Sequence, residues 1–427
     1  MSTDSDRRFA RFTTGHWPAL ALWTAVWLLF FAPLLAGVAH IANGDFSGQF
    51  HAFGLFQARE MAAGRLPLWS PGSFGGFPFA ADPQSAAFYP LRWLTILLSL
   101  PWDFPYYALQ LEASLHIWLA GAFAYCLAYD ITRRRATGLL AAFAFGLGGY
   151  LTSYPLLQLA ILESITWLPA ILFLLRRALL NGPARPLAAA AGVALGLSVL
   201  AGHPQTALHV VYVAAVYYLF LAWRARRPIW ATVKLGALLG VIALGVSAAA
   251  WLPAVRYTAE TMRANVDYAF VSSGFPLLDY LQLVAPGVRS LWSPQYIGLA
   301  AALFAALALF QRDRVTAADP TPGGGVSRSE IACWGAVALI TLCLSLGDNG
   351  ILFELAYHVA PGFALFRQQE RLAGVFSLAM ALLAAQGLAI WLSRPRPSRV
   401  AEGRAVLRVG GLLLLAGITL AAMRDQA

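Results

Sequence analysis

Charged residues are scarce in this chain of 427 residues. They make up only 12% of it, whereas hydrophobic residues make up 59%. Ordinary soluble domains carry about 25% charged and about 45–50% apolar residues. This imbalance excludes a soluble globular enzyme and an intrinsically disordered chain. The formal net charge of +10 would indicate nucleic-acid binding in a soluble protein, so its meaning here depends on where the charges lie along the chain.

Cysteine is equally rare. The three cysteines, Cys126, Cys333 and Cys343, all lie in apolar runs and form no spaced pair. This pattern supports neither a secreted module held by disulfides nor a zinc site. The sequence also lacks a P-loop, and it has no GxGxxG dinucleotide pattern in a strand–helix context.

Long apolar runs, in contrast, recur along the chain. An α-helix needs about 20 apolar residues to cross a bilayer core of about 30 Å. The runs predict an all-α integral membrane protein, with residues 1–427 forming one polytopic domain of about eleven spans. The predicted spans are 17–41, 105–129, 137–154, 156–175, 186–201, 205–223, 229–252, 294–311, 330–346, 371–393 and 406–423. The first run is too long for the core of a cleaved signal peptide. The segment 91–101 is too short to cross and is predicted to be re-entrant or interfacial.

The basic residues alternate between the two sides of these spans. Arg7, Arg8 and Arg11 precede the first span, and every second connection after it is basic. The connections on that side hold 21 basic and 7 acidic residues, whereas the rest of the chain holds 9 and 13. Because basic loops stay in the cytoplasm, the N-terminus is predicted to be cytoplasmic. The positive charge is therefore a topology signal, and no nucleic-acid partner is expected.

The connections on the other side are long and carry most of the candidate chemistry. They cover 42–104, 253–293 and 347–370 and are rich in aromatic residues, Pro and Gly, a composition that is not typical of disorder. Long ordered loops are usually functional, so the active surface is predicted to be extracytoplasmic. Nucleotide sugars are absent from that side. An enzyme there needs a donor delivered by the membrane, such as a polyprenyl-phosphate sugar.

The first long loop is the most informative. Asp45 follows the first span directly, and a helix over 46–64 would place Asp45 and Gln49 on one face. Aromatic side chains and closely approaching glycines in this loop suit a cleft for a sugar or an isoprenoid phosphate. The alternative is that Asp45 caps the next helix, and that Trp69 and Tyr89 belong to an interfacial aromatic belt.

A series of short motifs runs through the chain. In the first loop they are Gly44-Asp45 with Gln49, Pro67-Leu68-Trp69, Gly75-Gly76-Phe77-Pro78, Ala81-Asp82-Pro83-Gln84-Ser85 and Phe88-Tyr89-Pro90. Downstream they are Ala201-Gly202-His203-Pro204-Gln205, Trp251-Leu252-Pro253, Tyr296-Ile297-Gly298-Leu299, Pro361-Gly362, Phe366-Arg367 and Glu370-Arg371. In this order they resemble the bacterial YfhO-type membrane proteins. A first span followed by a large loop that opens on an acidic residue also resembles the multi-spanning C-type (GT-C) glycosyltransferase fold.

This resemblance implies a membrane enzyme that adds sugars to cell-surface glycans, polymers or lipids from a polyprenyl-phosphate donor. It places the protein in the bacterial cytoplasmic membrane, in contact with membrane lipids and with its active face outside. It also implies that Asp45, the first-loop acidic residue, is catalytic. Members of that family are usually longer, so the chain is expected to be a short form, a fragment or half of a split gene.

Glycosyl transfer needs a base that deprotonates the acceptor hydroxyl and a positive charge that stabilises the departing phosphate. Asp45 is the candidate base, and its alternative role is to hold a divalent cation, Mg or Mn. Asp82 is the second candidate catalytic carboxylate, and its alternative is a turn residue before Pro83. No other cofactor is expected.

Arginines on the outer side are the expected phosphate ligands, because a guanidinium binds phosphate oxygens bidentately. Their alternative role is contact with lipid headgroups. For Arg367, Glu370 and Arg371 a local ion-pair cluster is a further alternative, and for His203 the alternative is a solvated turn histidine. The predicted substrate-binding residues are Gln49, Trp69, Gln84, Tyr89, His203, Gln205, Arg256, Arg263, Arg367, Glu370 and Arg371.

Ionisable residues also lie inside the predicted spans, where they are costly and usually face a cavity or a partner. Glu112 and His116 are most simply a buried pair, and Glu163 lies in the fourth span. These residues are also compatible with a transporter or flippase of a lipid-linked precursor, and the short chain with a non-catalytic subunit of an envelope glycan assembly. A carrier is expected to show inverted repeats. The sequence has no convincing internal repeat and its long loops lie on one side, which favours the enzyme.

Overall fold

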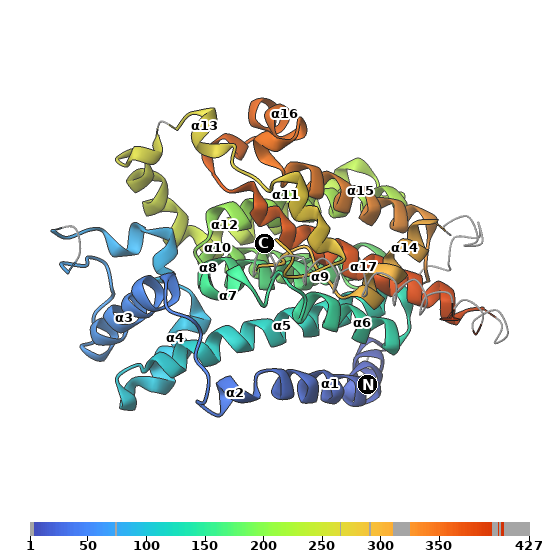
Figure 1. The fold of residues 1–427 in the computed structure, drawn as a ribbon, viewed down its shortest axis with the longest axis horizontal. Coiled ribbons are helices and arrows are strands. Elements are labelled where there is room, and N and C mark those ends of the chain that lie inside the picture. The colour runs from blue at the N-terminus through green and yellow to red at the C-terminus, as the bar shows by residue number, and fades with distance from the viewer. Residues whose placement is uncertain are drawn as a thin grey trace, which may run out of the picture.

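Helices make up the architecture of the chain (Figure 1). The structure is a computed structural model that describes residues 4–72, 75–264, 266–289, 292–310 and 325–394, together with 400, 403 and 404. These residues contain no strand, and one isolated antiparallel bridge joins Ser70 to Phe77. The predicted all-α class is confirmed.

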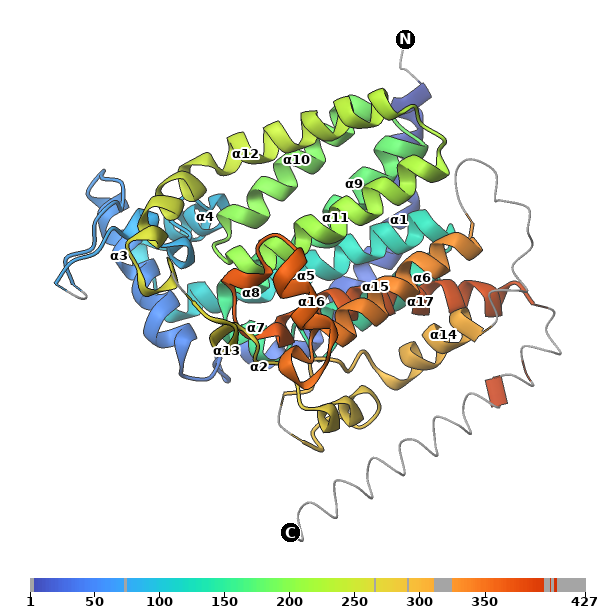
Figure 2. The ribbon, with the colours of Figure 1, turned by 90° about the horizontal axis from the view of Figure 1, so that it is seen from above.

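Long helices lie side by side and form the body of the protein (Figure 2). In chain order they are α1 (Asp4–Phe30), α5 (Tyr106–Thr132), α6 (Arg135–Gly146), α8 (Leu159–Thr166), α9 (Leu168–Leu180), α10 (Ala184–Leu200), α11 (Pro204–Arg224), α12 (Ile229–Ala259), α14 (Leu299–Phe310), α15 (Arg328–Leu344) and α17 (Ala373–Leu392). Shorter helices are α2 (Ala32–Leu35), α3 (Ala52–Ala62), α4 (Pro90–Ser99), α7 (Tyr154–Leu157), α13 (Tyr268–Val271) and α16 (Leu352–Val359).

The connections add a π-helical turn and several 3-10 turns. The π-helical turn is Phe46–His51. The 3-10 turns are Phe79–Ala81, Pro83–Ser85, Leu100–Trp102, Met262–Ala264, Leu277–Leu283, Gly347–Asn349, Phe363–Leu365 and Gln369–Leu372.

Ten of the eleven predicted spans overlap helices of the body, although 17–41 ends later than α1 and α2 do, and the eleventh, 406–423, lies outside the described residues. Within the described residues, five segments are long and apolar enough to cross a membrane, namely Tyr106–Thr132, Leu159–Leu180, Pro204–Arg224, Ile229–Ala259 and Gln369–Leu392. Three further apolar helices, α6, α10 and α14, are shorter. The multi-span membrane character is thus confirmed, whereas the number of eleven spans stays a prediction.

The predicted span 137–154 is shorter in the structure, because α6 ends at Gly146. The turn that follows approaches another segment too closely for a helix to continue. The N–H of Gly149 donates to the carbonyl of Tyr296 at 2.7 Å, and a Cβ on Gly149 would lie 2.0 Å from the carbonyl oxygen of Ser293. This turn therefore joins α6 to the segment that leads into α14.

The predicted span 156–175 is broken at Gln158, and it has a single turn residue at Trp167 across which Leu159–Leu180 continues as one apolar segment. Gln158 separates α7 from α8 with ψ of 71°, and Trp167 separates α8 from α9. Pro169 lies at the start of α9, where its missing N–H and fixed φ suit the beginning of a helix better than its middle. The break at Gln158 is important for the candidate site because it releases the side chain of Gln158 toward the first loop.

The two kinds of connection gather at opposite ends of the bundle (Figure 2). At one end, here called the loop end, lie α3, α4 and the turn Met262–Ala264 that follows α12. At the other, here called the basic end, α5, α9 and α11 finish in arginine-bearing turns and α15 begins. This arrangement agrees with the predicted alternation of loops. Which end faces the cytoplasm stays a prediction.

A buried ion cluster ties four helices together at the basic end. Arg176 of α9 donates to Asp130 of α5 at 2.9 Å and to Glu330 of α15 at 2.6 Å, and all three side chains are at most 1% exposed. Glu330 also accepts from Arg224 at 2.8 Å and from Tyr217 at 2.7 Å, both on α11. Burial of a charge is tolerated only with such complete pairing. We call this group the basic-end cluster.

Candidate functional site

The first loop folds around a small aromatic core. Phe77 and Phe79 pack on Phe53 and Phe56 of α3, with ring centroids 5.2 Å apart for Phe53 and Phe79 and 4.8 Å apart for Phe56 and Phe79. The helix predicted over 46–64 forms as the π-helical turn followed by α3. The aromatic core holds the next turn, which carries Asp82 and Gln84, against the bundle.

Asp82 begins that turn. Its Oδ1 accepts the backbone N–H of Gln84 at 2.9 Å, and Pro83 occupies the first position, where no N–H is needed. Asp82 therefore fills the turn role that the sequence offered as an alternative. Among the described hydrogen bonds of the Asp82 carboxylate, Oδ1 is the oxygen that is used. Burial raises the pKa of Asp82, while the Gln84 N–H and the Arg263 guanidinium oppose this rise.

Asp45 lies at the start of the π-helical turn, on the surface of the loop end. Its Oδ2 accepts a hydrogen bond from the amide of Gln158, at the break between α7 and α8. One turn later, Gln49 Nε2 donates to Gln84 Oε1 at 3.0 Å. The structure thus links Asp45 to the break between α7 and α8. It also links Gln49 to the turn that Asp82 begins.

A second predicted motif meets this turn directly. Gly202 lies between α10 and α11 with φ of +94°, and a Cβ there would be 2.2 Å from the carbonyl oxygen of Pro83. Only glycine allows such an approach without strain. The motifs around Asp82 and around His203, about 120 residues apart in the sequence, therefore lie against each other.

His203 caps the start of α11 and is buried. Its Nδ1 accepts the backbone N–H of Thr206 at 3.1 Å. Burial lowers the pKa of His203 well below its usual value, and Arg371, His209 and Arg263 lower it further. His203 is therefore a neutral capping residue beside the arginines. The alternative of a solvated turn histidine is wrong, because His203 lies in the turn but is buried.

Arg371 lies beside this turn, and the charges of Arg367 and Arg371 both act on Arg263. Arg371 donates from Nη1 to Gln205 Oε1 at 2.6 Å and from Nη2 to Gln368 Oε1 at 2.5 Å. Its Nε is buried without a hydrogen-bond partner in the described structure. The pKa of Arg263 is lowered by burial and by its neighbours Arg367 and Arg371, and Asp82 opposes this. We call Arg263, Arg367 and Arg371 the arginine cluster.

Other members of the predicted set lie differently. Arg367 lies over the ring of Phe270, with the guanidinium carbon 5.5 Å from the ring centroid. Glu370 forms no ion pair with its neighbours in the described structure, and its Oε2 is buried without a partner. Arg256 is exposed near the end of α12, and no described hydrogen bond or ion pair joins it to the arginine cluster. Trp69 is exposed and lies over Gly76.

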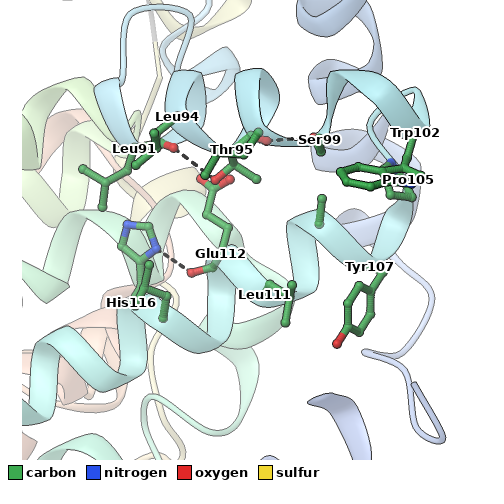
Figure 3. Close-up of a pocket in the computed structure, with 13 residues that line it drawn as sticks. Leu91, Leu94, Thr95, Ser99, Trp102, Pro105, Tyr107, Leu111, Glu112 and His116 are labelled. Carbon is green, nitrogen blue, oxygen red and sulfur yellow. Dashed lines mark hydrogen bonds between the residues drawn. The ribbon is translucent and has the colours of Figure 1, made fainter. Parts of the chain in front are cut away.

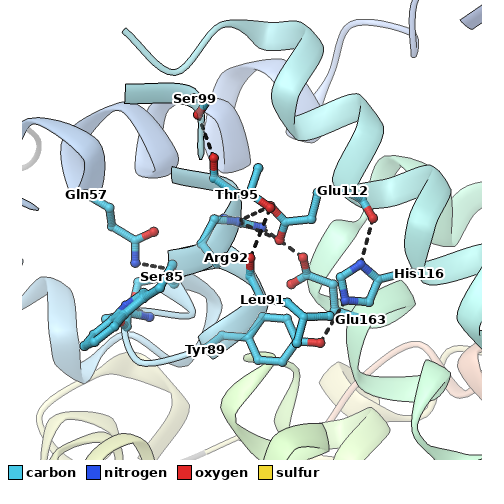
Figure 4. Close-up of polar contacts among 12 residues, drawn as sticks. Gln57, Ser85, Tyr89, Leu91, Arg92, Thr95, Ser99, Glu112, His116 and Glu163 are labelled. Carbon is cyan, nitrogen blue, oxygen red and sulfur yellow. Dashed lines mark hydrogen bonds and ion pairs between the residues drawn. The ribbon is translucent and has the colours of Figure 1, made fainter. Parts of the chain in front are cut away.

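Beneath the first loop lies a second buried ion cluster (Figure 4). Arg92 of α4 donates from Nε to both oxygens of Glu112 on α5, at 2.9 and 3.1 Å, and from Nη2 to Glu163 on α8 at 3.0 Å. All three side chains are 1% exposed. Glu163 Oε2 is buried and has no hydrogen-bond partner among the described residues. We call these residues, with His116 and Tyr89, the loop-end cluster.

The pairing of Glu112 with His116 differs from the prediction. His116 Nδ1 contacts the backbone carbonyl of Glu112 at 2.8 Å, so it must donate, and Nε2 then accepts from the Tyr89 hydroxyl at 2.8 Å. The carboxylate of Glu112 pairs with Arg92 instead. Sequence reasoning did not single out Arg92. The available signal was an arginine in an apolar segment on the same side as Glu112 and Glu163. Tyr89 is fully buried here, so its assignment to an interfacial belt is wrong.

Neither the loop-end cluster nor Asp45 forms a complete metal site within the described structure. Glu112, His116 and Glu163 are the one set in the described residues whose ligand atoms lie within 4.8 Å of one another. However, Arg92 contacts both carboxylates, and both ring nitrogens of His116 already have partners. Asp45 belongs to no such set within the described structure, so it could hold a divalent cation only with oxygens from a ligand. Mg²⁺ is often held in this way, by one or two carboxylates plus phosphate.

No family model matches the chain, and no curated protein matches it. Among solved structures the chain is similar to one described as the single-particle cryo-EM structure of arabinofuranosyltransferase AftD from Mycobacteria, with a TM-score of 0.55. The chain shares its fold with a glycosyltransferase. The two sequences are 20% identical, and the match covers 94% of this chain and 26% of AftD. The chain therefore spans about a quarter of that protein, and the resemblance to YfhO-type proteins stays a prediction.

Proposed function

We propose that this protein is an integral-membrane glycosyltransferase that transfers a sugar from a polyprenyl-phosphate donor to a cell-surface glycan, polymer or lipid on the extracytoplasmic side. The observation that carries the proposal is the arginine cluster, which lies at the loop end beside Asp82, His203 and Gln205. A group of neighbouring cations, one of them held in place, is an arrangement that stabilises a departing phosphate. The fold shared with AftD supports the same class of reaction.

In this proposal the donor phosphate binds at Arg263, Arg367 and Arg371. The unpartnered Nε of Arg371 offers one hydrogen-bond donor for a phosphate oxygen. Gln205 and Gln368 hold its two other nitrogens and so fix the plane of the guanidinium. Arg371 is thereby preorganised before the donor arrives, which avoids a cost of ordering it during the reaction.

A carboxylate then accepts the proton of the acceptor hydroxyl as that oxygen bonds to the anomeric carbon of the sugar. The bond between this carbon and the phosphate oxygen breaks, and polyprenyl phosphate leaves. We assign the base to Asp45, whose surface position suits contact with a glycan acceptor. Asp82 is the second candidate, since a raised pKa brings a carboxylate closer to the range that suits a general base. If Asp45 instead holds Mg²⁺ or Mn²⁺, the ion would supply charge to the phosphate.

The assignment of the cluster is tested with two arginine variants of equal charge change. Polyprenyl-phosphate sugars, including the arabinofuranose form, are supplied to purified protein with a bacterial envelope glycan extract, and released polyprenyl phosphate is measured. Arg371→Met is expected to lower transfer by about 10²-fold or more, as loss of one charge-stabilising donor does. Arg256→Met, outside the cluster, is expected to retain most of it. Equal effects of the two variants would overturn the phosphate assignment.

The carboxylates are separated in the same assay. Asp45→Asn is expected to lower transfer by about 10²–10⁴-fold, the usual contribution of a general base. Asp82→Asn keeps an oxygen that can cap the turn of Gln84. Full activity in Asp45→Asn, together with loss in Asp82→Asn, would move the base to Asp82. A dependence of the wild type on added Mg²⁺ or Mn²⁺ that Asp45→Asn abolishes would assign the cation role.

A further inference from the structure

The carboxylates of the loop end differ in the partners that their oxygens already have. Glu112 lines the apolar pocket between α4 and α5 (Figure 3). Both of its oxygens accept from Arg92, so this carboxylate is committed to a buried ion pair. Asp82 closes a turn of its own loop. Asp45 is different, because the described hydrogen bond of its carboxylate comes from Gln158, a side chain 113 residues away in the sequence.

Asp45 begins the π-helical turn without capping it. An aspartate that caps a helix usually has an extended backbone and accepts an N–H of the first turn. Asp45 has φ of −62° and ψ of −29°, which are helical values, and its side chain makes no capping hydrogen bond. The capping role that the sequence offered as its alternative is therefore wrong. Its carboxylate contacts Gln158 of the bundle instead.

The backbone beside Asp45 is fixed to the start of α5. Phe46 is fully buried and meets the ring of Tyr106 edge to face, with centroids 5.5 Å apart. The Tyr106 hydroxyl donates to the carbonyl of Ile41 at 2.9 Å, and the N–H of Ile41 donates to Gln110 Oε1 at 2.7 Å. The freedom that is left to Asp45 therefore lies in its side-chain torsions, which a hydrogen bond to the carboxylate restricts.

The amide of Gln158 is not needed for the start of α8. Gln158 lies in an apolar run and is 6% exposed, where a polar side chain is costly unless it is hydrogen-bonded. It precedes α8 without a side-chain capping bond, and glutamine is not among the residues that favour this position. The contact with Asp45 thus accounts for a glutamine where helix formation alone does not favour one.

The segment that leads to Gln158 is held in place at its other end. Tyr150 is 3% exposed, and its hydroxyl donates to the backbone carbonyl of Arg371 at 3.1 Å. The ring of Tyr150 packs against the first turn of α17. The segment 150–158 therefore contacts Asp45 from a support that is itself fixed, and this support includes the backbone of one residue of the arginine cluster.

We infer that Gln158 is a positioning residue for sugar transfer. Its Nε2–H holds Oδ2 of Asp45 and leaves Oδ1 to accept the proton of the acceptor hydroxyl. The inference rests on the proposed function, in which Asp45 is the base. A carboxylate oriented before the acceptor binds need not be ordered during the reaction, and a misplacement of about 1 Å can cost about 10²-fold in rate. Gln158 itself touches no substrate.

The test compares Gln158→Met with Asp45→Asn and with the double variant, using the purified full chain in the transfer assay. Methionine keeps the unbranched side chain and removes the donor. Gln158→Met is expected to lower kcat about 10²-fold and to leave the KM for the donor unchanged. The double variant is expected to be no slower than Asp45→Asn, because a residue that acts through Asp45 has no effect without it. Losses that multiply, or an unchanged kcat in Gln158→Met, would overturn the inference.

An exchange of the two side chains keeps the test decisive if Gln158→Met does not fold. Gln158→Glu places a second carboxylate against Asp45, so repulsion is expected to lower both the denaturant midpoint and kcat. Asp45→Asn combined with Gln158→Glu swaps donor and acceptor across the same contact. Its midpoint is expected to return toward the wild type while transfer stays lost, because residue 45 is then no base. A midpoint that does not recover would contradict the contact on which the inference depends.

Gln386→Met is the matched control for removal of a buried amide. Gln386 is fully buried on α17, and its Oε1 has no partner in the described structure, so its loss is expected to leave kcat unchanged. An equal fall of kcat in both methionine variants would remove the role assigned to Gln158.

The outcomes also separate this inference from the proposed function. Transfer by the wild type that Gln158→Met leaves unaffected would uphold the transferase and refute the positioning role. Absence of transfer by the wild type would refute the transferase, and with it this role of Gln158, even if the exchange variant recovers its stability.

Discussion

The loop-end cluster and the basic-end cluster bury charge in opposite ways. Glu112 and Asp130 lie on the same helix, and 1.5 Å per residue separates them by about 27 Å, close to the thickness of a bilayer core of about 30 Å. At the basic end, Asp130 and Glu330 share four arginines, and each of their four oxygens has a partner. At the loop end, two carboxylates share Arg92, and one oxygen of Glu163 has none.

This difference in the pairing of carboxylate oxygens indicates different roles for the two ends. In the basic-end cluster every carboxylate oxygen has a partner, and the cluster joins α5, α9, α11 and α15. The loop-end cluster anchors α4, a helix of the first loop, to two helices of the bundle. It therefore positions the loop that carries Asp82 and Gln84, and it lies beside the pocket between α4 and α5. We expect the basic end to govern stability and the loop end to govern activity.

The largest expected effect is at the basic end. Arg176→Met would leave Asp130 and Glu330 buried with one common partner removed, which lowers the free energy of unfolding by about 3–5 kcal/mol. Denaturant unfolding in detergent measures this. Arg177→Met is the control because its side chain is 32% exposed and its removal leaves Asp130 paired with Arg133 and Arg176. Similar losses in the two variants would show that the buried ion pairs of the basic-end cluster do not govern the stability of the protein.

The two carboxylates of the loop-end cluster are expected to be unequal. Glu112→Gln removes a charge that accepts twice from Arg92 and is expected to cost about 1–3 kcal/mol. Glu163→Gln leaves one carboxylate for one guanidinium and supplies an amide at the oxygen that now lacks a partner. It is expected to change the free energy of unfolding by less than about 1 kcal/mol. The prediction fails if Glu163→Gln is the more damaging variant.

The contact between the first loop and the turn before α11 gives a third test. Gly202→Ala would place a methyl group 2.2 Å from the Pro83 carbonyl at a positive φ, and such overpacking costs about 1–3 kcal/mol. Because the displaced segment carries Asp82, activity is expected to fall with it. Gly240→Ala is the control, since nothing lies within 4 Å of its Cβ and helical Gly→Ala is expected to stabilise by up to about 1 kcal/mol. Equal responses would remove the proposed role of the contact.

The fourth expected effect is a pH dependence at the loop end. The folded protein holds the pKa of His203 well below the ordinary 6.5, so the unfolded chain binds a proton below pH 6.5 that the folded chain does not. Stability is therefore complete above pH 6.5 and falls as the pH drops, by about 1.4 kcal/mol per pH unit for one proton. His203→Asn keeps a capping side chain without a titrating group. The difference in unfolding free energy between the two proteins should narrow from pH 7 to pH 5, and parallel curves would contradict this.

Hydropathy and charge alternation were enough to predict the class of fold and the separation of the two kinds of connection. Both signals are local: a run of apolar residues, and an arginine at its end. The span 137–154 was overestimated because α6 ends where Gly149 meets Ser293, a contact between segments that no local pattern reports. The break at Gln158 and the turn residue Trp167 lie in an apolar run and do not change its hydropathy.

The candidate site was predictable residue by residue but not as an arrangement. The sequence offered Asp82 and His203 on the same side of the membrane, and the structure places their motifs in contact through Gly202. The sequence predicts four equivalent arginines as phosphate ligands, whereas in the structure Arg256 has no described contact with the other three. The loop-end cluster depends on Arg92 meeting Glu163, which lies 71 residues away. Such pairing follows from packing of helices and carries no signal in either residue's own neighbourhood.

Sugar transfer in detergent tests the central claim most directly, because a micelle has no two compartments between which a substrate could be carried. Purified protein is given a polyprenyl-phosphate sugar and a glycan acceptor, and the sugar is followed by mass. The account predicts transfer in the wild type and its loss in both Asp45→Asn and Arg371→Met. Absence of transfer with every donor in detergent, together with movement of the same lipids across sealed vesicles by the same protein, would contradict it and identify a transporter.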